Sequence, residues 1–277
     1  MGVTKTFVLM TGLMLIFMYV GELLGGADGM KTAFIIACAI NLFSYFFSDK
    51  LVLAHYKAQR VDKNDDSGLY QIVQRLAERA NLPMPKVYII PDKVPNAFAT
   101  GRNPSHAAVA ANQGLLDMLS EEEIEGVLAH EMSHVKHRDI LIGSVAAIFV
   151  SAITYLARMS NARYSNNRRS GLLVVLGAVL IPIAATIIQM TISRTREYAA
   201  DAGAAQLTGH PEWLMSALAK LDNMAKQTTM QRATPETAHM FIVNPFSSFS
   251  KSLATLFSTH PSTEKRIARL AEIKKAL

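Results

Sequence analysis

Four stretches of this 277-residue chain are long, apolar and nearly free of charge. Such stretches favour helices that cross a lipid bilayer, because one crossing needs about 17 to 25 mostly apolar residues. A single globular core does not explain them, since the hydrophobic half of the chain is concentrated in these runs. The sequence therefore predicts a multi-pass membrane protein whose spans cover residues 7–24, 32–47, 140–157 and 171–192.

The charged residues of the chain gather beside the apolar runs and not on one amphipathic face. The net charge is +6, and basic residues follow the second span. The positive-inside rule then places the N-terminus and the region after residue 48 in the cytoplasm. We do not expect nucleic acid as a partner, because no aromatic residues alternate with the basic ones. The basic residues concerned are Lys50, Lys57, Arg60 and Lys63.

The first run is interpreted as a retained anchor, because no small-residue cleavage site follows it and a second span comes almost at once. The only cysteine, Cys38, lies within that second span. No disulfide can therefore form within the chain, and apolar packing is the usual role of a cysteine in such a place.

The sequence His-Glu-Met-Ser-His at residues 130–134 carries the chemistry of the chain. Residues four apart lie on the same face of a helix, so His130 and His134 can bind one metal ion together. Imidazole nitrogens are common zinc ligands, and Glu131 lies one position round the helix. We therefore predict that His130 and His134 bind Zn²⁺. Glu131 is the predicted general base, which takes a proton from the attacking water and returns it to the leaving amine.

The residues before this motif predict where its helix begins. Ser120 and Glu123 form a capping box, and Leu119 with Ile124 forms a hydrophobic staple, so the helix should begin at Glu121. Helical periodicity then separates an inward face from an outward one. The inward face is expected to carry Ile124, Val127, Leu128 and Glu131, and the outward face Glu121, Glu122 and Glu125.

A catalytic zinc usually has three protein ligands and an open fourth position, so a third ligand is needed. His137 is unsuitable, because seven residues along a straight helix place it about 10.5 Å from His130. Glu197 and Asp201 lie four apart in another predicted helix, so Glu197 can bind the metal while Asp201 accepts the free N–H of a ligating histidine. Without the upstream motif, this pair would be read as surface carboxylates beside neighbouring arginines.

Between these motifs the patterns predict a small sheet and several further helices. Asn81 and Pro83 should end a helix of about fifteen residues that contains Leu69, Ile72 and Leu76. Strands are predicted at residues 86–90, 96–100 and 107–111, helices at 193–207, 211–227 and 262–275, and a loop-rich segment at 231–258.

The predicted organisation alternates membrane and soluble parts. Both halves of the metal site must lie on one side of the bilayer, so an even number of crossings must separate them. Four arginines between the third and fourth runs disagree with a full hairpin, because such clusters normally stay cytoplasmic. Those runs either cross fully, enter partway or pack on the soluble domain. The expected parts are a transmembrane hairpin at 1–48, the first part of the soluble domain with the zinc-binding helix at 49–139, two apolar segments at 140–192 and the second part of that domain with the third ligand at 193–277.

Four motifs in this order closely resemble the HtpX family of bacterial membrane-bound zinc metalloproteases, relatives of the CAAX prenyl-protein proteases. The resemblance covers essentially the whole chain. It rests on the His-Glu-Met-Ser-His helix, Glu197-Tyr-Ala-Ala-Asp201, Asn96-Ala-Phe-Ala-Thr-Gly101 and the C-terminal His260-Pro-Ser-Thr-Glu-Lys-Arg266.

The resemblance implies a mainly α membrane protein, with transmembrane helices and a gluzincin-type zinc metalloprotease domain that contains a small β-sheet. It implies one zinc ion bound by His130, His134 and Glu197. Glu131 is then the general base, and Asp201 supports the metal ligands without binding the ion itself. It also implies an edge strand, against which a substrate backbone pairs, although an ordinary edge strand has the same composition. The strand residues are Asn96, Ala97, Phe98 and Ala99, and His260 and Arg266 are implied helpers of the transition state or of the site's structure.

The expected function is an integral zinc endopeptidase of the bacterial inner membrane, with its active site in the cytoplasm. The family implies cleavage of misfolded membrane proteins in quality control under stress. One alternative is a membrane scaffold or chaperone with a structural zinc and no proteolysis, but structural sites normally have four protein ligands and only three are evident. Another alternative is a CAAX-type prenyl-protein peptidase, a family that has more spans than are predicted here.

Overall fold

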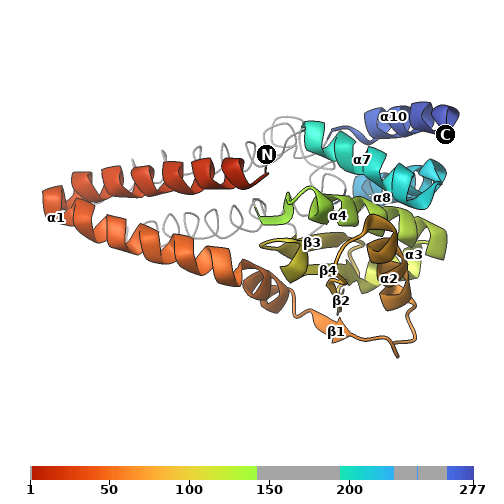
Figure 1. Ribbon diagram of the computed structural model, residues 1–277, viewed down its shortest axis with the longest axis horizontal. Helices are drawn as coiled ribbons and strands as arrows, with labels where there is room; N and C mark the ends of the chain where they lie inside the picture. The colour runs from red at the N-terminus through yellow and green to blue at the C-terminus, as the bar shows by residue number, and fades with distance from the viewer. Residues whose placement is uncertain (1, 142–193, 228–241, 243–260) are drawn as a thin grey trace.

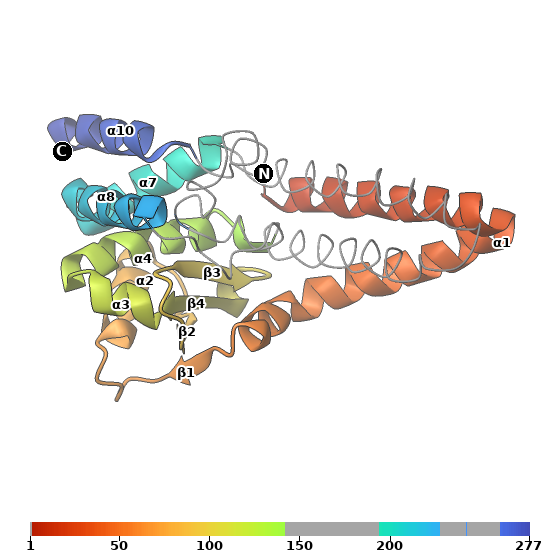
Figure 2. The same cartoon turned by 180° about the vertical axis from the view of Figure 1, so that it is seen from behind.

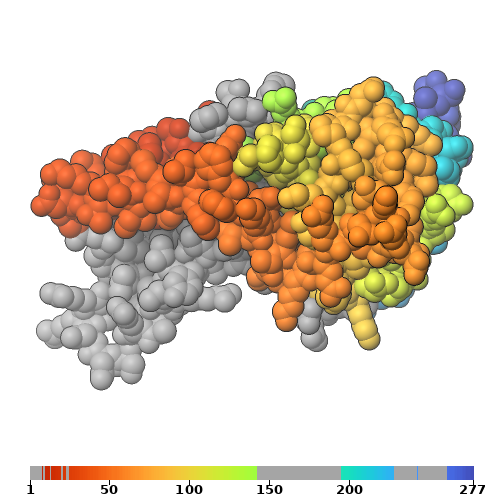
Figure 3. Space-filling model, turned by 60° about the horizontal axis from the view of Figure 1, so that its bottom comes forward, coloured from red at the N-terminus to blue at the C-terminus, as the bar shows by residue number. Residues whose placement is uncertain are grey.

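The computed structural model describes residues 2–141, 194–227, 242 and 261–277 (Figure 1). In it, a long helical hairpin projects from a body of sheet and helices, as the space-filling view also shows (Figure 3). The predicted apolar segments 140–157 and 171–192 lie outside the described residues, apart from Ile140 and Leu141. His260 and the predicted loop-rich segment 231–258, apart from Ile242, also lie outside them.

The projecting hairpin is α1 (Gly2–His55), which consists of two helical arms. The arms join where Gly25 and Gly26 leave helical geometry. Gly26 has a φ of 61°, a left-handed conformation that glycine adopts without steric cost. The predicted spans 7–24 and 32–47 fall within the two arms. The second arm continues beyond residue 48 as far as His55, so the charged segment after the span begins as helix.

The surface of α1 suits lipid better than water. Val8 and Ile35 are each 68% exposed, and further large apolar side chains are exposed along the same helix. Among the described residues, Gly25–His55 is the one helix long and apolar enough to cross a bilayer, with a mean hydropathy of 1.6. A shorter apolar helix, Met10–Tyr19, lies in the first arm. The N-terminal hairpin is therefore the described part of the chain best suited to a membrane.

The body contains a four-stranded sheet in the order β1-β2-β4-β3. The strands β2 and β4 are parallel, whereas β1 pairs with β2 and β3 pairs with β4 in antiparallel fashion. The three predicted strands are confirmed to within one residue, and Asn96 lies just before the strand predicted to contain it. Strand β1 was not predicted because it is short and largely exposed. The bounds are β1 (Gln59–Val61), β2 (Lys86–Ile90), β3 (Ala97–Gly101) and β4 (Ala107–Asn112).

Helix α4 lies at the centre of the body. The sheet and α2 pack on one side of it, α7 and α8 pack on the other, and α10 lies outermost against α7 and α8 (Figure 2). The predicted helices are confirmed, whereas the short α3 was not predicted. The bounds are α2 (Leu69–Ala80), α3 (Gln113–Met118), α4 (Glu121–Lys136), α7 (Arg194–Thr208), α8 (Pro211–Gln227) and α10 (Thr263–Ala276).

Helix α4 begins at Glu121, as predicted. The Ser120 hydroxyl accepts the Glu123 N–H at 3.4 Å, and the Glu123 carboxylate accepts the Ser120 N–H at 2.9 Å. The prediction that Glu125 faces outward is wrong, because its side chain is only 7% exposed. It forms ion pairs with Arg75 at 2.8 Å and with Arg79 at 2.9 Å. Both arginines belong to α2, and the periodicity of α4 carries no information about that neighbour.

Candidate metal centre

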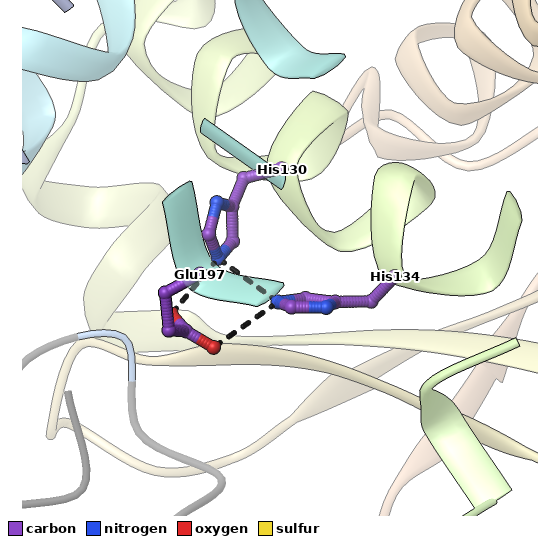
Figure 4. Close-up of side chains that lie close together, drawn as sticks. All are labelled: His130, His134 and Glu197. Carbon is purple, nitrogen blue, oxygen red and sulfur yellow. Dashed lines mark hydrogen bonds and ion pairs between the residues drawn. The ribbon is translucent and has the colours of Figure 1, made fainter. Parts of the chain in front are cut away.

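Three side chains converge between α4 and α7 (Figure 4). His130 and His134 stand one turn apart on α4, and their Nε2 atoms lie 3.2 Å from each other. Glu197 reaches them from the first turn of α7, with its oxygens 3.6 Å from His130 Nε2 and 3.5 Å from His134 Nε2. His130 and Glu197 are buried, at 2% and 7% exposure. The structure thus brings together the three residues that the sequence singled out as ligands.

The spacing of these atoms fits a small tetrahedral ion. Ligand bonds of about 2.0–2.1 Å in a tetrahedron place neighbouring ligand atoms about 3.3 Å apart. The two Nε2 atoms are 3.2 Å apart, and each lies 3.5–3.6 Å from a different oxygen of Glu197, so small side-chain adjustments suffice to reach that spacing. Two imidazoles and a carboxylate are also a donor set that suits zinc and leaves one position open. The residues present therefore fit a catalytic metal ion.

The buried side of His130 is supported by an aspartate and an arginine. Asp201 Oδ1 lies 3.0 Å from His130 Nδ1. Arg266, on α10, donates to both Asp201 oxygens, at 2.9 Å from Nε and 2.6 Å from Nη2. Arg266 and Asp201 are each only 1% exposed. The C-terminal helix therefore contributes a buried charge pair directly behind a candidate ligand.

These contacts change the acid–base properties of the apo site. Burial alone would lower the pKa of His130, but its hydrogen bonds to Asp201 and Glu197 outweigh burial and raise that pKa to about 9. Burial would raise the pKa of Asp201, but the Arg266 guanidinium and His130 lower it to about 2. His130 therefore holds a proton at neutral pH in the apo protein, opposite an ionised Asp201.

Close packing brings Glu197 within reach of the histidines. A Cβ atom built on Gly203 of α7 would lie 2.2 Å from the Ser133 hydroxyl of α4. A side chain at position 203 would thus require Ser133 or the two helices to shift. Glycine at this point lets the backbone of α7 approach the face of α4 that carries His130.

Glu131 faces the edge strand β3. Its carboxylate accepts the Ala99 N–H at 2.9 Å, and the residue is 8% exposed. Strand β3 lies at the end of the sheet, and no strand of the described residues pairs with it on its outer side. The residue predicted as base and the strand predicted to hold substrate are thus in direct contact.

A second chain of hydrogen bonds ties the start of β3 to α10. The Asn96 side-chain oxygen accepts the Ile242 N–H at 3.2 Å, and the Ile242 carbonyl accepts from Arg266 Nη1 at 2.9 Å. Ile242 is buried at 4% exposure. The Arg266 guanidinium therefore connects the Asp201 carboxylate, through Ile242, with Asn96 at the start of β3.

Two further residues near the end of α4 bear on the site: His137, which the sequence excluded as a ligand, and Asp139, which it did not identify. His137 is exposed at the C-cap of α4 and is not among the three converging side chains, as expected for a residue that is not a ligand. Asp139 was not singled out from the sequence, yet its Oδ2 lies 3.6 Å from His134 Nδ1. A carboxylate five residues after the second histidine was the available signal, but its approach depends on how α4 ends.

Comparisons with known proteins agree with this geometry. Residues 63–274 match peptidase family M48. The chain belongs to this family. A Protease HtpX homolog from Campylobacter hominis is 63% identical, over 99% of both chains. Proteins with the same description from Sulfurovum sp. and Burkholderia ambifaria are 56% and 50% identical, over 98% of this chain and 99% and 96% of theirs.

The family assignment also settles the broad function. The chain is a membrane metalloprotease of the M48 family, as the sequence predicted, and the alternative of a non-proteolytic scaffold is not favoured. The crystal structure of S. mikatae Ste24p shares the fold, with a TM-score of 0.54 and 19% identity. It matches 94% of this chain, which spans 62% of the length of that protein.

Proposed function

We propose that this M48 peptidase is a zinc-dependent endopeptidase of the gluzincin type, with His130, His134 and Glu197 as metal ligands and Glu131 as general base. The observation that carries the proposal is the convergence of His130, His134 and Glu197, whose ligand atoms lie within 4.8 Å of one another, close enough for one zinc ion to bind all three. The origin of the third ligand supports the gluzincin type, because it is a glutamate from a separate helix.

The residues around the site have distinct roles in peptide hydrolysis. When bound, zinc would polarise the scissile carbonyl and acidify a water molecule. Glu131 takes the proton of the attacking water and then delivers it to the leaving amine. The Ala99 N–H holds the Glu131 carboxylate in place. The substrate backbone pairs along β3, which lies at the edge of the sheet and beside the base.

We further propose that segment 140–192 forms a membrane hairpin between the two halves of the protease domain. Asp139 and Arg196 flank this segment and form an ion pair of 3.5 Å. A segment that starts and ends at the same place fits an even number of crossings. The basic residues after the first hairpin support an N-terminus and active site on the cytoplasmic side of the bacterial inner membrane. The substrates we propose are cytoplasmic parts of misfolded membrane proteins, in quality control under stress.

Purified full-length protein in detergent should bind one zinc ion per chain and cleave an unfolded polypeptide such as casein. A chelator should abolish cleavage, and added Zn²⁺ should restore it. Metal analysis and gel-based cleavage measure both. Cleavage that survives complete metal removal would contradict the proposal. Zinc binding with no cleavage would favour the scaffold, and cleavage confined to prenylated C-terminal peptides would favour the CAAX-type peptidase.

Zinc binding should release a proton from the site at pH 8. The pKa of His130 is raised from 6.5 to about 9, so without metal the side chain is mostly protonated at pH 8 and must lose the proton to bind metal. Below about pH 9 a proton competes with Zn²⁺ for His130, so the apparent zinc affinity should rise about tenfold per pH unit from pH 6.5 to 9. For a histidine with the ordinary pKa, this rise would end near pH 6.5. Calorimetry in two buffers of different ionisation enthalpy counts the protons. Zinc binding without proton release at pH 8 would show that His130 is already neutral.

A further inference from the structure

Both candidate histidine ligands have an aspartate beside the nitrogen that faces away from the metal. For His130, this residue is Asp201, at 3.0 Å from Nδ1. For His134, it is Asp139, whose Oδ2 lies 3.6 Å from Nδ1. Histidines that bind metals almost always donate their second N–H to a carboxylate, a carbonyl or a water, which fixes the tautomer and the ring orientation. The second of these pairs has no role in the function described so far.

The way α4 ends places Asp139 beside His134. The Asp139 N–H donates to the His134 carbonyl at 3.0 Å, and the Arg138 N–H donates to the Val135 carbonyl at 3.1 Å. Arg138 has a φ of 59°, in the left-handed region. These features define a Schellman motif, in which the side chains at the positions of His134 and Asp139 are frequently in contact. The backbone geometry therefore brings the Asp139 carboxylate near the His134 imidazole.

Arg196 holds Asp139 from the other helix. Its Nη1 lies 3.5 Å from Asp139 Oδ1, and the two side chains are only 17% and 11% exposed. Arg196 directly precedes the ligand Glu197, so the ion pair joins the end of α4 to the start of α7. The pairing resembles the one behind His130 but is looser, since Arg266 donates two hydrogen bonds to Asp201 whereas Arg196 and Asp139 form only an ion pair. Each histidine thus has its own aspartate and arginine.

We propose that Asp139, held by Arg196, is the positioning residue for His134. A small rotation of the Asp139 side chain brings the 3.6 Å separation within the hydrogen-bond range of about 2.7–3.2 Å. The His134 N–H on Nδ1 is then donated to Asp139, and Nε2 is fixed toward His130 and Glu197. This role rests on the proposed function, since it concerns the binding of the same zinc ion.

The test compares zinc affinity among variants of the full-length protein in detergent. Asp139→Ala should weaken Zn²⁺ binding about 10- to 100-fold, the effect typical for the partners of metal ligands. Asp139→Asn keeps an oxygen that accepts the His134 N–H, so it should restore most of the lost affinity. Arg196→Met should weaken binding less than Asp139→Ala. Competition with a chromogenic chelator measures the affinities, and the visible spectrum of the Co²⁺-loaded protein reports the geometry of the ligands.

Arg138→Gly provides the matched control. Glycine favours the left-handed conformation of this position, so the Schellman motif and the wild-type zinc affinity should be retained. If Asp139→Ala does not fold, Asp139→Asn and Arg196→Met still carry the test.

The outcomes separate this inference from the proposed function. Failure of the parent protein to bind Zn²⁺ would overturn the zinc site itself. Tight binding by the parent with unchanged affinity and Co²⁺ spectrum in Asp139→Ala would overturn only the role of Asp139. An Asp139→Asn variant as weak as Asp139→Ala would also contradict positioning through the imidazole N–H.

Discussion

Glu131→Gln should reduce peptide hydrolysis by about 10²- to 10⁴-fold while one zinc ion stays bound. The amide has nearly the shape of the carboxylate, and its oxygen still accepts the Ala99 N–H that Glu131 accepts at 2.9 Å. It cannot take a proton from water, so only the base is lost. Initial rates of peptide cleavage and metal analysis of the same preparation measure the two effects.

Glu122→Gln is the matched control for this variant. It makes the same chemical change on an exposed position of α4, so it should cleave at the parental rate. Hydrolysis by Glu131→Gln at the parental rate would show that another group acts as base. Loss of zinc from that variant would instead show that Glu131 is needed to hold the metal.

The features of this protein that could be predicted from sequence are local ones. The capping box of Ser120 and Glu123 fixes where α4 begins, and four-residue spacing then places His130 and His134 on one face. Both signals lie within a few turns of one helix. They depend little on what packs around it, which is why the structure reproduces them.

The features that could not be predicted depend on neighbours far away in the chain. The burial of Glu125 follows from two arginines of α2, and the sheet order places β3 outside β4 although it precedes β4 in sequence. The contact of Asp139 with His134 needs a left-handed residue after α4. Glycine would have signalled that turn, but the position is occupied by Arg138. Even for Glu197, spacing alone allowed a surface carboxylate, and only the upstream motif favoured a ligand.

Among single substitutions, we expect the largest loss of stability from Arg266→Met, which breaks the buried ion pair between Arg266 and Asp201. Both side chains are 1% exposed and share two hydrogen bonds. Arg266→Met leaves the buried Asp201 charge without its guanidinium and with only the His130 imidazole beside it, at a cost of about 3–5 kcal/mol. The unfolding midpoint should fall by roughly 6–20 °C for a domain of this size. Circular dichroism during heating in detergent measures the shift.

Two further variants separate the lost ion pair from lost packing on α10. Arg269→Met alters an exposed arginine of the same helix that lies over the Tyr198 ring, so it should cost only about 0.5–1 kcal/mol. The double variant Arg266→Met with Asp201→Asn removes both charges, so it should lose less stability than the sum of the single variants. Additive losses would show that the pair is not coupled. A parental unfolding midpoint for Arg266→Met would show that the C-terminal helix does not hold the metal site together.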